Sequence, residues 1–172
     1  MLEIYAAIYH NRENKRRILQ IMKYIKRDIT KTIKKNLARD KSILLLGPRQ
    51  VGKTTLIREE INPQINLSFA NAEIRQSFEK DLVWSIKNLE AQINAHASKP
   101  IVFIDEVQKV PQTMDSIQDM IDRKIANFIL SGSSARKLVH GKNINLLPGR
   151  VVLLHMTPVN YSEMPIPKPN VS

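Results

Sequence analysis

The chain has 172 residues, of which 42% are hydrophobic and 25% charged, a composition that suits one domain with a real core and excludes global disorder. It has no cysteine, which excludes disulfide scaffolds and thiol chemistry, and no apolar run near the roughly 20 residues of a spanning helix, so we expect a cytoplasmic protein without a membrane partner. The net charge is +11, and residues 1–41 alone hold twelve Lys and Arg against four Asp and Glu.

The hydrophobic pattern alternates between helix-like and strand-like segments along the chain. Apolar residues at every fourth position from Ile25 to Leu37 predict a basic amphipathic helix near the N-terminus. Short apolar runs predict strands at 43–46, 101–104, 128–130 and 151–154, and the alternating Ile65, Leu67 and Phe69 predict a fifth strand at 65–69. Further helices are expected at 54–61, 82–93 and 111–123, with core positions for Trp84, Met114 and Met120. Strands that alternate with helices in this way predict a three-layer α/β fold with a mainly parallel sheet.

The segment LLLGPRQVGKTT at 44–55 has the spacing of a phosphate-binding loop, between a predicted strand and a predicted helix. Its glycines, Gly47 and Gly52, let the backbone wrap around a β-phosphate without a side chain in the way. Lys53 would reach the β- and γ-phosphates, and the Thr54 hydroxyl would ligate Mg²⁺. The residues expected to bind the nucleotide are Gly47, Pro48, Arg49, Gln50, Val51, Gly52, Lys53, Thr54 and Thr55.

Two carboxylates follow the predicted strand 101–104, at the strand end where ligands bind in open α/β sheets. Asp105 would hold Mg²⁺ through water, and Glu106 would orient and polarise an attacking water molecule. A kinase of small molecules has no use for a water-activating carboxylate, and a GTPase would need an Asn-Lys-x-Asp guanine reader, which the sequence lacks. The pair therefore favours hydrolysis of ATP.

Three further residues are candidates for contact with the γ-phosphate. Ser131 and Ser133 follow the strand at 128–130, where a polar side chain would bind the phosphate or the attacking water, and the sequence does not choose between them. Arg150 stands immediately before the last strand. It is either a stabiliser of γ-phosphate charge, in its own chain or in a neighbouring subunit, or a structural arginine.

These motifs together resemble a family of prokaryotic AAA+-type ATPases. The similarity lies in GPRQVGKTT at 47–55, FIDEVQK at 103–109 and SGSSARKL at 131–138, and it covers about residues 22–164. The resemblance implies a P-loop fold of the class with a catalytic glutamate, use of ATP and Mg²⁺, and ATP-driven conformational switching. Such proteins usually continue into a further C-terminal region, so we expect a homo-oligomer or a separate C-terminal partner.

The expected organisation is an N-terminal extension at 1–21, an ATP-binding domain at 22–164 and a proline-rich tail at 165–172. Two alternatives stay open. The chain is a truncated ATPase that binds ATP without turning it over, or an ATP switch whose basic N-terminal segment contacts nucleic acid. A solvated lysine-rich helix face explains the same charge without any partner.

Overall fold

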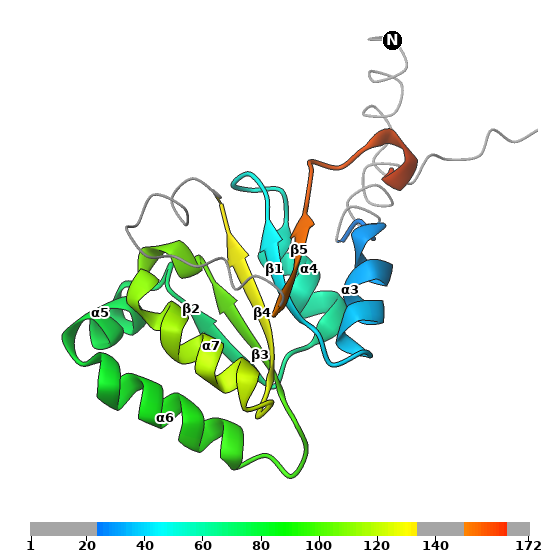
Figure 1. Cartoon of the computed structure of the whole chain (residues 1–172). Helices are drawn as coiled ribbons and strands as arrows, with labels where there is room; N and C mark the ends of the chain where they lie inside the picture. Colours follow the sequence, from blue (N-terminus) through cyan, green and yellow to red (C-terminus); the bar gives the residue numbers. More distant parts are fainter. Residues whose placement is uncertain (1–23, 134–149, 165–172) are drawn as a thin grey trace, which may run out of the picture. The chain divides into compact units, whose positions relative to one another are not determined.

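The computed structural model describes residues 24–133 and 150–164 (Figure 1). These residues belong to two compact units, one that spans Ile29–Pro158 and one that contains residues 24–28 and 159–164. The predicted extension at 1–21 and the proline-rich tail at 165–172 lie outside the described residues. Among the residues that are described, no helix has the length and apolar character needed to cross a bilayer.

Within the described residues, the larger unit contains a sheet of five parallel strands. Their spatial order is β2 (Ile65–Ser68), β3 (Ile101–Asp105), β4 (Asn127–Gly132), β1 (Ser42–Leu46) and β5 (Val151–His155). The predicted strands are thereby confirmed, although β4 runs on through Ser131 and Gly132, which pair with Leu45 and Leu46 of β1. The carboxyl ends of all these strands lie at one edge of the sheet, where β4 separates β1 from β3.

Helices cover both faces of the sheet (Figure 1). One face carries α5 (Ala72–Lys80), α6 (Leu82–Asn94) and α7 (Met114–Asp122). The other face carries α3 (Ile29–Leu37) and α4 (Lys53–Leu56), which continues as the π-helix η1 (Ile57–Ile61). The predicted basic helix is therefore present, but it begins at Ile29 rather than Ile25.

The side chains of β1 show how this three-layer core is divided. Leu44 and Leu46 point to the core that includes Ile117 of α7, whereas Ile43 and Leu45 point to the core that includes residues of α3 and α4. All four of these β1 side chains are at most 2% exposed. A strand that is buried on both faces appears in the sequence as a continuous apolar run, which is why β1 was predictable. The three-layer α/β fold is confirmed.

Two features of the helices differ from the sequence prediction. Helix α5 was not predicted, although Asn71 caps it by accepting hydrogen bonds from the backbone N–H groups of Glu73 and Ile74. The prediction that Trp84 lies in the core is wrong, because its side chain is 60% exposed. The buried side of α6 carries Ser85, Leu89 and Ile93, and the neighbouring position 84 points about 100° away from that side. Met114 and Met120 of α7 are buried, as predicted.

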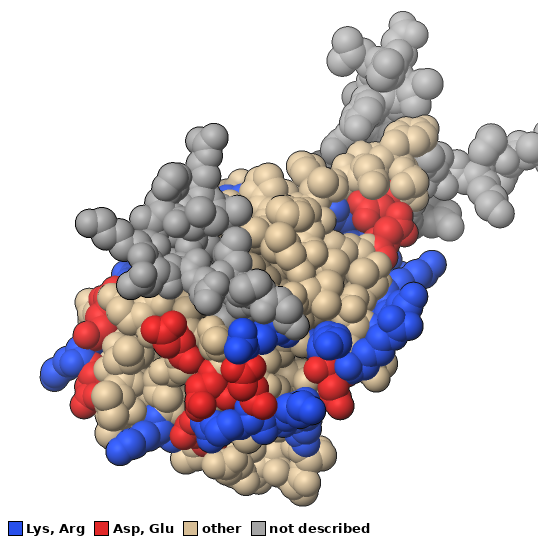
Figure 2. Space-filling view, in the orientation of Figure 1, with Lys and Arg blue, Asp and Glu red and all other residues tan. Residues whose placement is uncertain are grey.

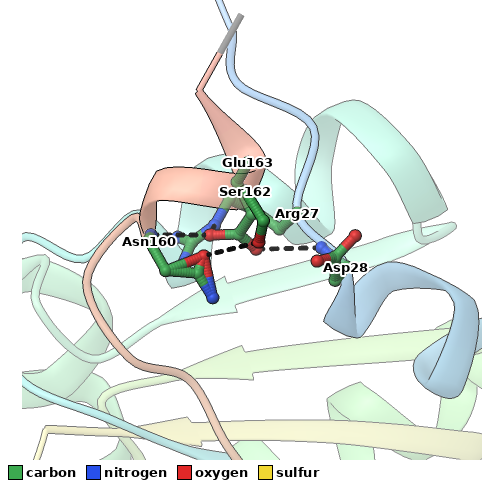
Figure 3. Close-up of polar contacts among 5 residues, drawn as sticks. All are labelled: Arg27, Asp28, Asn160, Ser162 and Glu163. Carbon is green, nitrogen blue, oxygen red and sulfur yellow. Dashed lines mark hydrogen bonds and ion pairs between the residues drawn. The ribbon is translucent and has the colours of Figure 1, made fainter.

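The smaller unit is held together by the carboxylate of Glu163, in the short 3₁₀ helix η4 (Tyr161–Glu163) (Figure 3). Glu163 accepts hydrogen bonds from Arg27 Nε (3.0 Å), the backbone N–H of Asp28 (2.9 Å) and the backbone N–H of Asn160 (3.1 Å). The Arg27 and Glu163 side chains are only 5% and 4% exposed. Burial raises the pKa of Glu163, but these three donors outweigh it, so the net shift of its pKa is downward.

Candidate functional site

The loop between β1 and α4 makes a tight bend that only glycine fits at two positions. A Cβ atom on Gly47 would lie 2.2 Å from the carbonyl oxygen of Met156, because the chain that leaves β5 passes directly beside the loop. Gly52 has a φ of +93°, in the left-handed region that side chains disfavour. The two glycines of the motif are therefore required by the fold as well as by the predicted phosphate contact.

Lys53, the first residue of α4, lies inside the loop rather than in solvent. Its side chain is buried, and Nζ donates hydrogen bonds to the carbonyl oxygens of Gly47 (2.7 Å) and Pro48 (2.8 Å). Burial lowers the pKa of Lys53, and the nearby carboxylates of Glu106 and Asp105 oppose that shift. A buried ammonium group thus stands at the base of the loop, next to the acidic pair.

Asp105, at the end of β3, connects three elements of the fold. Its Oδ2 atom accepts a hydrogen bond from Thr54 Oγ1 in α4 at 2.8 Å, and its Oδ1 atom accepts one from Ser131 Oγ in β4. Asp105 is 6% exposed and Ser131 is completely buried. Ser131 and Thr54 therefore each bind one oxygen of the Asp105 carboxylate and together orient it.

Glu106 adopts a left-handed backbone conformation with φ of 57°, which is uncommon outside glycine. Its Oε2 atom accepts hydrogen bonds from Gln108 Nε2 and from Ser133 Oγ, the latter at 3.3 Å. Gln108 Nε2 also donates to Ser133 Oγ at 3.1 Å. Sequence reasoning missed Gln108, because only the 3₁₀ turn η2 (Val107–Lys109) brings a side chain two residues away back onto Glu106.

A cavity of about 380 Å³ lies between the loop and Glu106. Its lining consists of Arg49, Gln50, Gly52, Lys53, Thr54, Thr55 and Glu106. The structure thus brings most of the predicted nucleotide-binding residues to one cavity with the predicted catalytic glutamate. Pro48 contributes a backbone carbonyl to Lys53, while Gly47 and Val51 do not line the cavity.

Arg150 lies at the opposite edge of the sheet. It precedes β5, which runs parallel to β1 from the Ser42–Val151 pair to the Leu46–His155 pair. Its Nε atom donates to both carboxylate oxygens of Asp122, at 2.7 and 2.9 Å. A strand of this length spans about 16 Å, so Arg150 does not reach the loop within its own chain. A role in a neighbouring subunit stays a prediction.

Thr54 at this cavity and Asp105 beside it fit a magnesium ion chemically. Mg²⁺ prefers oxygen ligands and is usually bound by one or two carboxylates together with water and substrate phosphates. The Thr54 hydroxyl and the Asp105 carboxylate supply such oxygens side by side. Within residues 24–133 and 150–164, no group of three or more His, Cys, Asp or Glu side chains could enclose a metal. A metal at this cavity would therefore need phosphate or water ligands as well.

The sheet order, the loop after β1 and the acidic pair after β3 define the fold of a P-loop nucleoside triphosphatase. A sequence profile described as AAA domain matches residues 39–165. The chain therefore belongs to the AAA domain family of P-loop ATPases, as the sequence motifs predict. This membership supports nucleotide binding and ATP hydrolysis in general terms.

Two curated relatives are uncharacterized mycobacterial proteins, Rv2008c of Mycobacterium tuberculosis and Mb2031c of Mycobacterium bovis. Each is 29% identical to this chain over 136 residues, which covers 77% of this chain and 28% of the relative. The chain thus spans little more than a quarter of the length of these proteins.

Two solved structures share the fold. The Walker-type ATPase PABY2304 of Pyrococcus abyssi has a TM-score of 0.55 and 18% identity, over 81% of this chain and 55% of that chain. AMPPCP-bound DnaA from Aquifex aeolicus has a TM-score of 0.54 and 16% identity, over 75% of this chain and 44% of that chain. At these identities the likeness concerns the fold alone.

Proposed function

We propose that this chain binds ATP with Mg²⁺ at the loop 47–55 and hydrolyses the ATP to ADP and phosphate. The proposal rests on one observation: Lys53, Thr54 and Glu106 line one cavity at the carboxyl edge of the sheet, and Asp105 accepts a hydrogen bond from Thr54 beside that cavity. These residues combine a buried cation for the phosphates, oxygen ligands for the metal and a carboxylate for water.

Lys53 supplies the positive charge for the triphosphate. Its Nζ atom is bound to the carbonyl oxygens of Gly47 and Pro48, which are neutral partners. A phosphate oxygen is a stronger partner for an ammonium group than a carbonyl, because the hydrogen bond is then charge-assisted on both sides. Nucleotide binding would therefore draw Nζ from the loop carbonyls toward the β- and γ-phosphates.

Thr54 and Asp105 are the residues that would hold magnesium, Thr54 directly and Asp105 through water. The ion, when bound, would neutralise charge on the phosphate oxygens. Ser131 would keep Asp105 in place, since it is completely buried and bound to the other carboxylate oxygen. Of the two serines, Ser133 is then the one whose contact with Glu106 suits it to respond to the γ-phosphate.

Glu106 would act as the general base. It accepts a proton from water while the water oxygen forms a bond to the γ-phosphorus and the bond from that phosphorus to the bridging oxygen breaks. The products are ADP and inorganic phosphate, and the proton is released to solvent when Glu106 is restored. Arg150 would contribute only if a second copy of the chain presented it to this site.

The test is phosphate release by the wild-type chain and by Glu106→Gln, with ATP affinity measured in parallel. We expect Glu106→Gln to keep the ATP affinity within about twofold and to lower turnover by about 100-fold or more, in the range of general-base effects. Equal turnover in the two proteins would overturn the catalytic assignment. Absent turnover with intact binding in the wild type would instead support the binding-only alternative.

A second candidate function is contact with nucleic acid, favoured by exposed basic side chains on α3 and in the turn that follows it. Lys31, Lys35 and Arg39 follow one another at intervals of four residues, all are exposed, and none of the three forms an ion pair within the described part of the chain. Figure 2 shows basic side chains gathered over α3. DNA affinity that falls steeply with salt and is lost on changing these three residues to Ala would support it, and no binding at low salt would exclude it.

A further inference from the structure

The side-chain amide of Gln108 lies between the proposed general base and the end of β4. Its Nε2 atom donates to Glu106 Oε2 and to Ser133 Oγ, the second bond at 3.1 Å. Ser133 also donates to Glu106 Oε2. Three polar side chains from two segments thus form a closed triangle of hydrogen bonds beside the cavity.

The carboxylate fixes the direction of this amide. An ionised carboxylate only accepts hydrogen bonds, so the NH₂ group of Gln108 must face Glu106, and the carbonyl oxygen Oε1 must point the other way. That Oε1 atom is buried and accepts no hydrogen bond from the described residues. A buried acceptor without a partner is unfavourable for the stability of the fold. The orientation of this amide therefore suits its hydrogen bond to Glu106 better than it suits the stability of the folded chain.

Both contacts to Glu106 engage the same oxygen, Oε2. The other oxygen, Oε1, is therefore the one that remains to accept a proton from water. The backbone of Glu106 is in the left-handed region, a conformation that persists only where its surroundings enforce it. The direction of the carboxylate is thus set from two sides, by the turn of the backbone and by the amide of Gln108.

We propose that Gln108 is a positioning residue that holds the Glu106 carboxylate in line for the attacking water, and that it links this carboxylate to Ser133 at the end of β4. The inference rests on the proposed function, because it assigns how the base of that reaction is oriented. Gln108 would touch neither ATP nor water, and its effect would pass entirely through Glu106.

The experiment compares Gln108→Ala with Gln112→Ala, a control glutamine that is exposed in the neighbouring turn η3 (Pro111–Thr113). Turnover of ATP is measured with its kcat and KM, and binding of ADP is measured by calorimetry with and without aluminium fluoride, which mimics the transferring phosphoryl group. We expect Gln108→Ala to lower kcat by up to about 100-fold, as for misplaced catalytic groups, with KM and ADP affinity within about twofold. It should also weaken the added affinity that aluminium fluoride gives, whereas Gln112→Ala should change none of these values.

A second variant separates hydrogen bonding from packing. Gln108→Glu keeps the shape of the side chain but replaces the donor with a like charge, so it should lose as much turnover as Gln108→Ala. In a Glu106→Gln background, Gln108→Ala should leave the residual rate unchanged, since the group that it positions is already absent.

The outcomes separate this inference from the proposed function. If the wild type binds neither ATP nor ADP, the proposed function fails, and the inference falls with it. If the wild type binds ADP, unchanged kcat and unchanged aluminium fluoride binding in Gln108→Ala would overturn the role of Gln108 alone. A parallel loss of ADP affinity and melting temperature would also overturn it, because Gln108 would then be a structural residue. If the wild type binds ATP but does not turn it over, the role of Gln108 is tested by the affinity that aluminium fluoride adds to ADP binding. A smaller gain in Gln108→Ala than in the wild type supports the role, and an equal gain overturns it.

Discussion

The hydroxyl of Thr54 donates a hydrogen bond to Asp105 Oδ2 over 2.8 Å, although the two residues are 51 positions apart in the sequence. This bond joins α4, the helix after the phosphate-binding loop, to strand β3. In the sheet, β3 is not adjacent to β1, the strand before that loop. The intervening strand β4 supplies Ser131, which binds the other oxygen of Asp105. The proposed metal-binding pair is therefore assembled by sheet order and not by closeness in sequence.

Asp105→Asn should remove the magnesium dependence of ATP binding. The substitution keeps the shape of the side chain but removes the negative charge that favours a divalent cation. We expect ATP affinity measured with Mg²⁺ to fall to the value that the wild type shows with EDTA, while affinity without metal changes by less than about twofold. Calorimetric titration of both proteins, with and without Mg²⁺, measures this. Retained magnesium dependence in Asp105→Asn would exclude Asp105 as the residue that holds the ion.

Gly47→Ala should destabilise the fold, independently of any effect on nucleotide. Its Cβ atom would lie 2.2 Å from the backbone oxygen of Met156, so main chain has to move, at a cost of about 1–3 kcal/mol as in other overpacked sites. The free energy of unfolding from urea titration without nucleotide gives this cost. Shortening the neighbouring side chain should not rescue the variant, because the clash is with backbone. A full rescue by Met156→Ala would show that the contact is misassigned.

The stability of the chain should depend on the ionisation of Glu163. The pKa of Glu163 is lowered in the folded chain, so the unfolded chain binds its proton more readily. The stability that this group contributes is present above the unfolded pKa of about 4.3 and is lost as the pH falls through the lower, folded pKa. Urea titrations between pH 3 and 7 should therefore show a steeper loss of stability in acid for wild type than for Glu163→Gln. The exposed Glu59→Gln serves as the control and should follow the wild type. Parallel curves for wild type and Glu163→Gln would refute this role.

The fold and the core of the site were predictable because their signals are local. A strand buried on both faces is a continuous apolar run, and the phosphate-binding loop is a fixed spacing of Gly, Lys and Thr around one turn. Asp105 and Glu106 are the two residues that come immediately after such a run, Ile101 to Ile104, in the sequence. In each case the residues that carry the signal are neighbours in the sequence.

The features that were missed depend on long-range packing or on backbone detail. Trp84 lies next to the apolar stripe of α6, and only the placement of that helix on the sheet decides which side of it is buried. Gln108 reaches Glu106 only because Glu106 is left-handed and a 3₁₀ turn follows. For Arg150 the sequence left two roles open. Its location, at the edge of the sheet away from the loop, follows only from the pairing of β5 with β1 and from the parallel direction of the two strands.

The most direct test of the central claim, that the loop 47–55 binds ATP through Lys53, is a calorimetric titration of ATP and Mg²⁺ into the wild type and Lys53→Ala. The exposed Lys87→Ala is the matched control, and melting temperatures establish that all three proteins are folded. We predict that Lys53→Ala weakens ATP binding by at least about 10-fold, since it removes a charge-assisted contact worth about 1.5–3 kcal/mol, while Lys87→Ala binds as the wild type does. Equal ATP affinity in the wild type and in a folded Lys53→Ala would contradict the claim.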